Sequence, residues 1–187
     1  MAAAPGNLPS NPLLQILIAA NFAARAHANQ KRKGVAGEPY INHLIEVAEL
    51  VAGSGAEADV NLIMACLLHD VVEDTTITRQ EISQAFNEDV ASLVMEVTDD
   101  KTLPKQTRKT LQVQTAPDKS VPAQALKIAD KISNLRALLY SPPPDWSIER
   151  KREYFDWARA VVSGFTAPNQ HLLHLFNQTY QRISEIR

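Results

Sequence analysis

The stretch that most constrains the fold is an apolar run that ends in a cluster of ionisable side chains. Residues 57 to 72 are apolar on nearly every side of a predicted helix, and the sequence ACLLHDVVEDT occupies residues 65 to 75. A helix that is apolar all round is buried in the centre of a protein. We therefore expect a central helix that brings His69 and Asp70 to the edge of the core.

Signals for helix starts and stops divide the rest of the chain into further helices. Asn11 before Pro12 is a start signal, and Thr78 with Glu81 forms a capping-box pattern. Three prolines at 142 to 144 end a helix, because proline cannot continue one. Together with the helical spacing of apolar residues, these signals predict helices over residues 13–26, 42–52 with Asn42 as its cap, 78–86, 88–97, 121–140, 147–164 and 168–186.

The remaining segments predict loops and no sheet. Residues 31–39 form a basic, glycine-containing loop, and residues 98–120 are polar, which predicts loop and broken helix. No run alternates between apolar and polar residues, as a half-buried strand does. We expect an all-α fold with irregularly packed helices: a single domain over residues 1–187, with residues 1–10 flexible.

Composition excludes several classes of function. The formal net charge is −2, with 45% hydrophobic and 21% charged residues, as in ordinary globular proteins and unlike nucleic-acid binders. The single cysteine, Cys66, lies in the apolar run, so no disulfide can form within the chain. The first apolar run, Leu13–Ala20, is too short to span a bilayer. We expect a cytoplasmic protein without membrane or nucleic-acid partners.

Two histidines and two aspartates are candidate metal ligands. His69 and Asp70 end the central helix, His43 lies near the start of the preceding one, and Asp130 lies in the middle of an apolar helix. A carboxylate in such surroundings needs a partner. A shared divalent cation would satisfy all four. Mixed imidazole and carboxylate ligands suit Mn²⁺, Fe²⁺, Co²⁺ or Zn²⁺, and we favour a single Mn²⁺.

Two further carboxylates follow this pair. Glu73 and Asp74 lie three and four residues beyond Asp70, near the same helix face. Because Mn²⁺ acidifies water less than Zn²⁺ does, a nearby carboxylate base is useful. We therefore interpret Glu73 and Asp74 as an acid/base pair. Asn134, one turn after Asp130, can hydrogen-bond a ligand.

Cationic and aromatic residues suggest an anionic ligand that carries a base or sugar. A phosphate needs positive groups, and a tyrosine ring can stack on a nucleoside. The candidates are Lys31, Arg32, Lys33, Lys105, Arg108, Lys109, Arg150 and Tyr154.

Each of these features also has a purely structural interpretation. His69 and Asp70 could simply cap a core helix, with Asp130 paired to Lys127, Lys131 or Arg136, and the basic loop could be a solvated surface. We expect His27 to be a satisfied packing histidine and Cys66 to be a core residue. We place His171 and His174 on a helix surface. The aromatic residues Trp146, Phe155 and Trp157 are interpreted as packing anchors.

Five segments carry a resemblance to a known family. They are AARAHANQKRKGVAGEPYINHLIEVA, ACLLHDVVEDT, LKIADKISNLRAL, VTDDKTLPKQTRKTLQVQTAP and EYFDWARAVVSG. Through the first three, the sequence resembles the HD-domain hydrolases of the alarmone (p)ppGpp, the hydrolase half of the RelA/SpoT proteins. Through the last two, it is more similar still to the stand-alone small alarmone hydrolases. The resemblance covers roughly residues 13 to 175.

The resemblance implies a fold, a reaction and a set of site residues. It implies the all-α HD-domain fold and hydrolysis of the 3′-pyrophosphate, giving GDP or GTP and pyrophosphate. The implied metal ligands are His43, His69, Asp70 and Asp130. Glu73 and Asp74 are implied to orient and deprotonate the attacking water, and the implied substrate contacts are Lys31, Arg32, Lys33, Asn134, Arg150 and Tyr154. No synthetase domain fits in 187 residues, so we expect degradation of the alarmone and not synthesis.

One departure and two other functions remain to be weighed. Leu44 stands where the family often has proline after the first histidine, and this removes no ligand, because proline is favoured but not required near a helix start. Another nucleotide substrate, such as (p)ppApp or NADPH, is compatible with the same fold. So is an HD domain that senses a nucleotide without turning it over.

Overall fold

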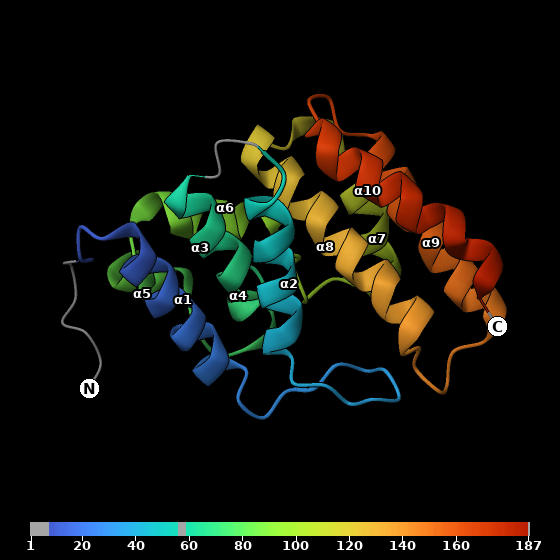
Figure 1. Cartoon of the computed structure of the whole chain (residues 1–187), viewed down its shortest axis with the longest axis horizontal. Coiled ribbons are helices and arrows are strands. Elements are labelled where there is room, and N and C mark those ends of the chain that lie inside the picture. The colour runs from blue at the N-terminus through green and yellow to red at the C-terminus, as the bar shows by residue number, and fades with distance from the viewer. Residues whose placement is uncertain (1–7, 56–58, 187) are drawn as a thin grey trace.

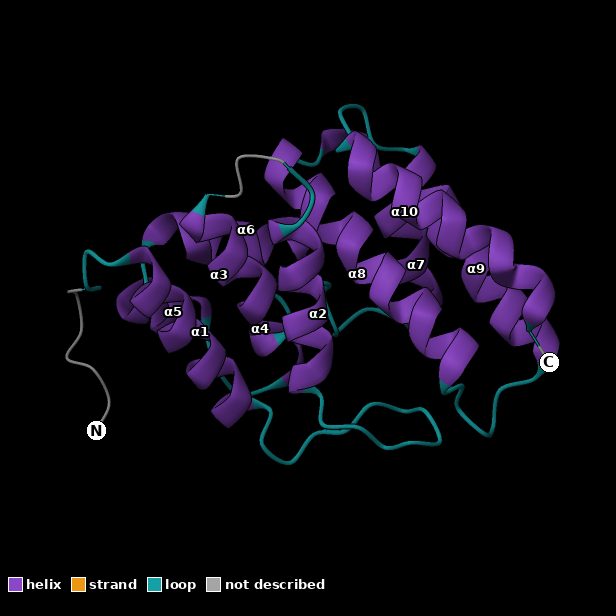
Figure 2. Ribbon diagram, in the orientation of Figure 1, coloured by secondary structure: helices purple, strands orange, loops and turns teal. Residues whose placement is uncertain are grey.

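The protein is helical throughout the part that the structure describes. The computed structural model describes residues 8–55 and 59–186. Its helices are α1 (Pro12–Ala26), α2 (Ile41–Ala52), α3 (Val60–Leu68), α4 (Val71–Asp74), α5 (Arg79–Ala85), α6 (Glu88–Val97), α7 (Lys105–Gln114), α8 (Val121–Tyr140), α9 (Ile148–Ser163) and α10 (Gln170–Gln181), with 3-10 turns η1 (Ala116–Asp118) and η2 (Arg182–Glu185). Within those residues there is no strand, only an isolated bridge between Lys31 and Pro39 (Figure 2). The all-α prediction is confirmed.

The helices pack in an irregular array around α2, α3 and α8. Helix α3 packs between α1 and α2, and α2 also packs against α8 (Figure 1). Helices α9 and α10 pack on α8, at the opposite end of the molecule from α1. Seven of the nine α3 residues, Leu62 to Leu68, are buried, which confirms that this apolar helix is central. This arrangement brings His43, His69 and Asp130 toward a common point.

The predicted helix over residues 57–72 is wrong at its end. The chain turns at His69 and Asp70, so that α3 ends at Leu68 and the one-turn helix α4 starts at Val71. His69 Nδ1 lies 2.8 Å from the carbonyl oxygen of Cys66, which the end of a helix leaves without a partner. The turn lets adjacent residues face the same side, which a straight helix does not. The expected start of this helix at 57, and most of the flexible tail expected over 1–10, lie outside the described residues.

Asn42 does not cap α2 as predicted. Tyr40 is the N-cap residue, in helical conformation and without a side-chain capping hydrogen bond, and Asn42 is already the second residue of the helix. The other predicted caps are present: Asn11 accepts two backbone N–H groups of α1, and Thr78 with Glu81 forms the capping box of α5. The start of α2 therefore has no side-chain hydrogen bond that caps it.

The basic loop between α1 and α2 is fixed to the end of α8. Ala36 N donates to Ser141 Oγ at 3.0 Å, and Val35 N donates to the carbonyl of Pro142 at 3.3 Å. A Cβ on Gly34 would lie 1.9 Å from the carbonyl oxygen of Ser141, so only glycine allows this approach. The loop thereby holds its cationic side chains beside α8.

The polar segment 98–120 contains loops, the short helix α7 and the turn η1, in agreement with the prediction of loop and broken helix. Helix α7 has no buried residue, yet it packs against α9. It forms one side of the cavity described below. No described helix combines the length and the apolar composition needed to cross a membrane.

Candidate metal centre and adjoining cavity

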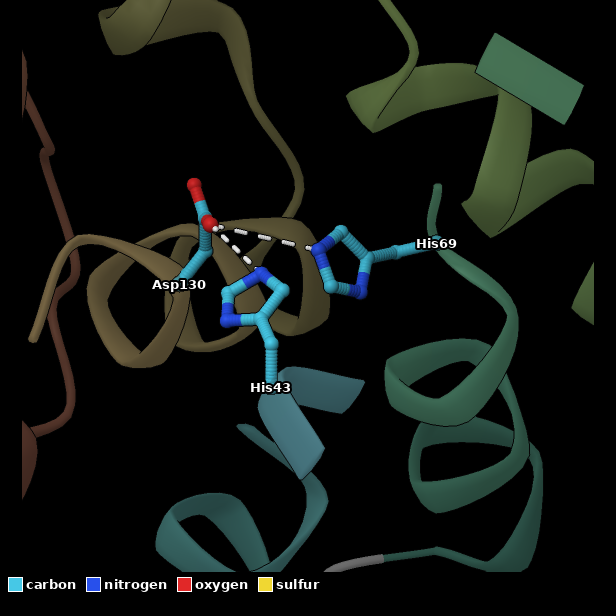
Figure 3. A group of neighbouring side chains, drawn as sticks. All are labelled: His43, His69 and Asp130. Carbon is cyan, nitrogen blue, oxygen red and sulfur yellow. Dashed lines mark ion pairs between the residues drawn. The ribbon is translucent and has the colours of Figure 1, made fainter. Parts of the chain in front are cut away.

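His43, His69 and Asp130 meet from three different helices. Their side chains point toward one another from α2, from the turn after α3 and from α8 (Figure 3). One ligand atom from each of the three residues lies within 4.8 Å of the others, and all three residues are buried. His43 Nε2 is 3.4 Å and His69 Nε2 is 3.9 Å from Asp130 Oδ1. The group has the composition and spacing of a divalent-metal site.

Asp70 lies beside this group but also has a partner of its own. Its Oδ2 atom is 3.2 Å from His69 Nε2 and 3.7 Å from His43 Nε2. The same oxygen accepts a 2.6 Å hydrogen bond from the hydroxyl of Tyr40. Tyr40 therefore fixes the Asp70 carboxylate next to both imidazoles.

The environment of His69 indicates that a cation belongs at the centre. A carbonyl oxygen can only accept, so Nδ1 carries the hydrogen that is shared with Cys66. Nε2 is buried, and within the described residues no hydrogen bond satisfies it, although carboxylate oxygens surround it. Burial lowers the pKa of His69, but Asp70 and Asp130 outweigh burial and raise it to about 9. These carboxylates favour a positive charge at Nε2, which a metal ion supplies as well as a proton does, so the residues fit a metal.

Glu73 and Asp74 lie on α4, one turn beyond the candidate ligands. Glu73 Oε2 accepts from Asp99 N at 3.1 Å, and its Oε1 lies 3.7 Å from Arg108 Nη1. Asp74 accepts from Gln30 Nε2 at 2.8 Å and pairs with Lys101. Burial, followed by the Asp70 carboxylate, raises the pKa of Glu73 above its usual value. A partly buried carboxylate of raised pKa is suited to accept a proton.

Asp130 contacts both a lysine and the two candidate histidine ligands, so it fits the structural and the metal interpretation alike. Lys131 Nζ lies 2.9 Å from Asp130 Oδ2, as the purely structural interpretation allows. The other oxygen, Oδ1, faces both imidazoles and accepts from Asn134 Nδ2 at 2.6 Å. Asn134 in turn accepts from Arg32 at 3.1 Å, so a residue of the basic loop connects directly to the candidate centre.

A cavity of 420 Å³ adjoins this centre, and we call it the cationic cavity. Its volume lies within the range of small-molecule sites. Most of the predicted site residues line it: Lys31, Arg32, Lys33, Glu73, Asp74, Lys105, Arg108, Lys109, Asn134 and Tyr154. Arg150 lines a neighbouring hollow of 320 Å³ with Tyr154, and it stacks on Trp146 at 4.3 Å. Spread over five segments of sequence, these residues come together in space.

Residues 19–155 match the family described as HD domain. This chain belongs to the HD-domain family. The match includes all four candidate metal ligands of the domain as well as Glu73 and Asp74.

Two named relatives and one solved structure show what this HD domain is similar to. The human protein named guanosine-3′,5′-bis(diphosphate) 3′-pyrophosphohydrolase MESH1 is 49% identical over 168 residues, covering 88% of this chain and 94% of the human one. The Drosophila melanogaster protein of the same name is 42% identical over 164 residues, covering 88% and 90%. A solved structure titled as a metazoan ortholog of SpoT that hydrolyses ppGpp has a TM-score of 0.87 and 38% identity, over 95% of this chain and 98% of that one.

Several residues that line the cavity of this HD domain were not predicted from the sequence. Gln30, Tyr40, Lys101 and Gln112 line the cationic cavity without having been singled out, and buried Lys131 contacts Asp130. Lys101 could have been found, because it lies in the same polar segment as Lys105. Gln30 and Tyr40 carry no such signal, since their roles depend on Asp74 and Asp70, more than 25 residues away.

The three aromatic residues pack against the core as predicted, and two of them also line the cationic cavity. Phe155 is fully buried, as predicted for a packing anchor. Trp146 and Trp157 pack against the core and also line the cationic cavity, where Lys109 Nζ lies 4.7 Å from the Trp157 ring. Both rings are half-buried, and Trp157 Nε1 also donates to the carbonyl oxygen of Lys109 on α7 at 3.0 Å.

The predictions for the cysteine and for two of the other histidines are confirmed, and the prediction for His27 is confirmed in part. His171 and His174 are exposed on α10, and Cys66 is buried, as predicted. His27 is buried and donates through Nδ1 to Gln30 Oε1 at 2.6 Å, but its Nε2 has no partner within the described residues. The prediction of a satisfied histidine is therefore only half right.

Proposed function

We propose that this HD domain is a metal-dependent (p)ppGpp 3′-pyrophosphohydrolase, which produces GDP or GTP and pyrophosphate. The observation that carries the proposal is the position of the carboxylate pair, Glu73 and Asp74, in the wall of the cationic cavity beside the histidine–aspartate group. The printed activity of the human and Drosophila relatives supports the same reaction.

The metal in this proposal is one divalent ion, with Mn²⁺ as first choice, held by His43, His69, Asp70 and Asp130. When bound, such an ion polarises a phosphoryl oxygen and lowers the pKa of water. Asp70 and Asp130 supply negative charge, and Tyr40 and Asn134 keep these two carboxylates oriented.

Glu73 is the proposed general base, assisted by Asp74. Asp99 N holds one oxygen of Glu73, and the other lies 3.7 Å from Arg108 Nη1 in the wall of the cavity. Glu73 removes a proton from water as the water oxygen bonds to the phosphorus next to the ribose 3′-oxygen. The bond from phosphorus to that 3′-oxygen breaks, and the proton is returned to the leaving ribose oxygen. Water oxygen therefore leaves in the pyrophosphate.

The cations of the cavity provide the proposed binding of the phosphates. Lys31, Arg32 and Lys33 approach from the loop, and Lys105 and Arg108 approach from α7 on the other side. Fixed positive groups stabilise negative charge as it develops on transferring phosphoryl groups. Tyr154, with Arg150 and Trp146, offers a stacking surface for the nucleoside. We also propose a cytoplasmic location, where such a nucleotide is available.

A substrate panel tests this proposal. The purified protein with saturating Mn²⁺ is incubated separately with ppGpp, ppApp and NADPH, and products are separated by anion-exchange chromatography. We expect GDP and pyrophosphate from ppGpp. Turnover of ppApp or NADPH alone would assign a different phosphohydrolase, and tight binding of ppGpp without any product would indicate a sensor.

A further inference from the structure

A second cavity adjoins His43 and shares only part of its lining with the cationic cavity. It has a volume of 590 Å³, and its lining includes His43, Glu46, Ser133 and Arg136. None of these four residues lines the cationic cavity. They come from only two helices, α2 and α8, which pack against each other. The proposed reaction gives no role to the last three.

The four residues form a continuous chain of polar contacts. His43 Nδ1 lies 2.8 Å from Ser133 Oγ, and both residues are buried. Ser133 Oγ donates to Glu46 Oε2 at 2.6 Å, and Arg136 Nη1 donates to Glu46 Oε1 at 2.9 Å. Each carboxylate oxygen of Glu46 therefore has a different donor.

The hydrogen positions along this chain follow from what each group can do. A hydroxyl has one hydrogen, and an ionised carboxylate can only accept. Ser133 must therefore give its hydrogen to Glu46, and it can only accept from His43. The hydrogen of the neutral His43 ring is then on Nδ1, which leaves the lone pair on Nε2, the atom that faces Asp130.

We propose that Ser133 and Glu46 are positioning residues that hold His43 in the tautomer able to bind a metal through Nε2. Partners of this kind fix the ring orientation of ligating histidines and raise their basicity. The inference rests on the metal centre of the proposed function, but it is independent of which nucleotide is cleaved. It gives the Glu46–Arg136 pair a role beyond surface electrostatics.

Replacing Glu46 by glutamine makes the sharpest test, because Arg136 determines how the amide must turn. Arg136 only donates, so the amide oxygen of Glu46→Gln faces Arg136 and the amide NH₂ group faces Ser133. Ser133 then accepts from the amide and gives its own hydrogen to His43 Nδ1. This reversal moves the ring hydrogen to Nε2, where it blocks the metal, although the side chain keeps nearly the same shape.

The first measurement is the dissociation constant for Mn²⁺, by isothermal titration calorimetry without nucleotide. We expect Glu46→Gln and Ser133→Ala to weaken binding about 10- to 100-fold. Gln178→Ala is the matched control, because Gln178 lines the same cavity but its side chain hydrogen-bonds to His174, and we expect wild-type affinity for it. Melting temperatures show whether each variant is folded. Glu46 is only half-buried, so Glu46→Gln stays informative even if Ser133→Ala does not fold.

The second measurement determines the tautomer of the His43 ring directly. ¹⁵N imidazole NMR of the metal-free protein at pH 8 shows which nitrogen of His43 carries the hydrogen. We expect Nδ1–H in wild type and Nε2–H in Glu46→Gln. Wild-type Mn²⁺ affinity and an unchanged tautomer in Glu46→Gln would overturn the inference.

Failure of the proposed function has a different signature. If wild type binds Mn²⁺ and the variants bind it weakly, but ppGpp is not cleaved, the inference holds and the substrate assignment is wrong. If wild type binds no Mn²⁺, both the metal centre and the inference are overturned.

Discussion

At the scale of single residues, the surroundings of Glu73 determine its proposed chemistry. The side chain is partly buried beside Asp70, and the Asp99 N–H group and Arg108 hold it in place. Glu73→Gln keeps this shape but cannot accept a proton. We expect kcat for ppGpp to fall about 10²- to 10⁴-fold, while Mn²⁺ binding is retained. Turnover is measured by product chromatography and metal by calorimetry, and near-wild-type turnover would remove Glu73 from the mechanism.

Gln30 offers a second test at this scale. Its amide connects His27 to Asp74, since Oε1 accepts from His27 and Nε2 donates to Asp74. Gln30→Ala removes the connection, and we expect kcat to fall about tenfold, or ~1.4 kcal/mol in activation free energy. Mn²⁺ affinity should not change, because the Gln30 side chain hydrogen-bonds to His27 and Asp74, which are not candidate ligands. A kcat equal to wild type would show that Asp74 needs no such support.

At the scale of elements, the contact between the basic loop and α8 orders the cationic side chains. A Cβ at position 34 would overlap the carbonyl of Ser141, so Gly34→Ala must displace the loop. We expect KM for ppGpp to rise several-fold, because Arg32 and its neighbours move from the cavity, while kcat changes less. Gly53→Ala is the control, since its Cβ would meet no atom closer than 3.3 Å. An unchanged KM in Gly34→Ala would show that the loop is not needed for binding.

The elements also show what sequence can and cannot predict. Helix positions follow from apolar spacing and caps, and the candidate ligands stand out because charged groups in apolar helices need partners. The turn at His69 and Asp70 gives no such signal, because an unbroken helix suits the same apolar residues. Tyr40 and Gln30 were missed for a related reason: polar side chains acquire their partners only when distant helices meet.

At the scale of the whole molecule, the candidate centre joins helices that lie far apart in sequence. His43, His69 and Asp130 connect α2, α3 and α8, so a bound metal stabilises the folded state and not the unfolded chain. At a free Mn²⁺ concentration of 100 times its dissociation constant, the gain is about 2.7 kcal/mol. We expect Mn²⁺ to raise the melting temperature of wild type but not of Asp130→Ala. Equal shifts in both proteins would place the metal elsewhere.

The central claim is that one divalent ion at this centre is required to cleave ppGpp. The most direct measurement is ppGpp hydrolysis by metal-stripped protein as Mn²⁺ is added back in known amounts. We predict no product without metal and full formation of GDP and pyrophosphate at one equivalent of tightly bound Mn²⁺. Hydrolysis by the stripped protein, or no hydrolysis once Mn²⁺ is bound, would contradict the account.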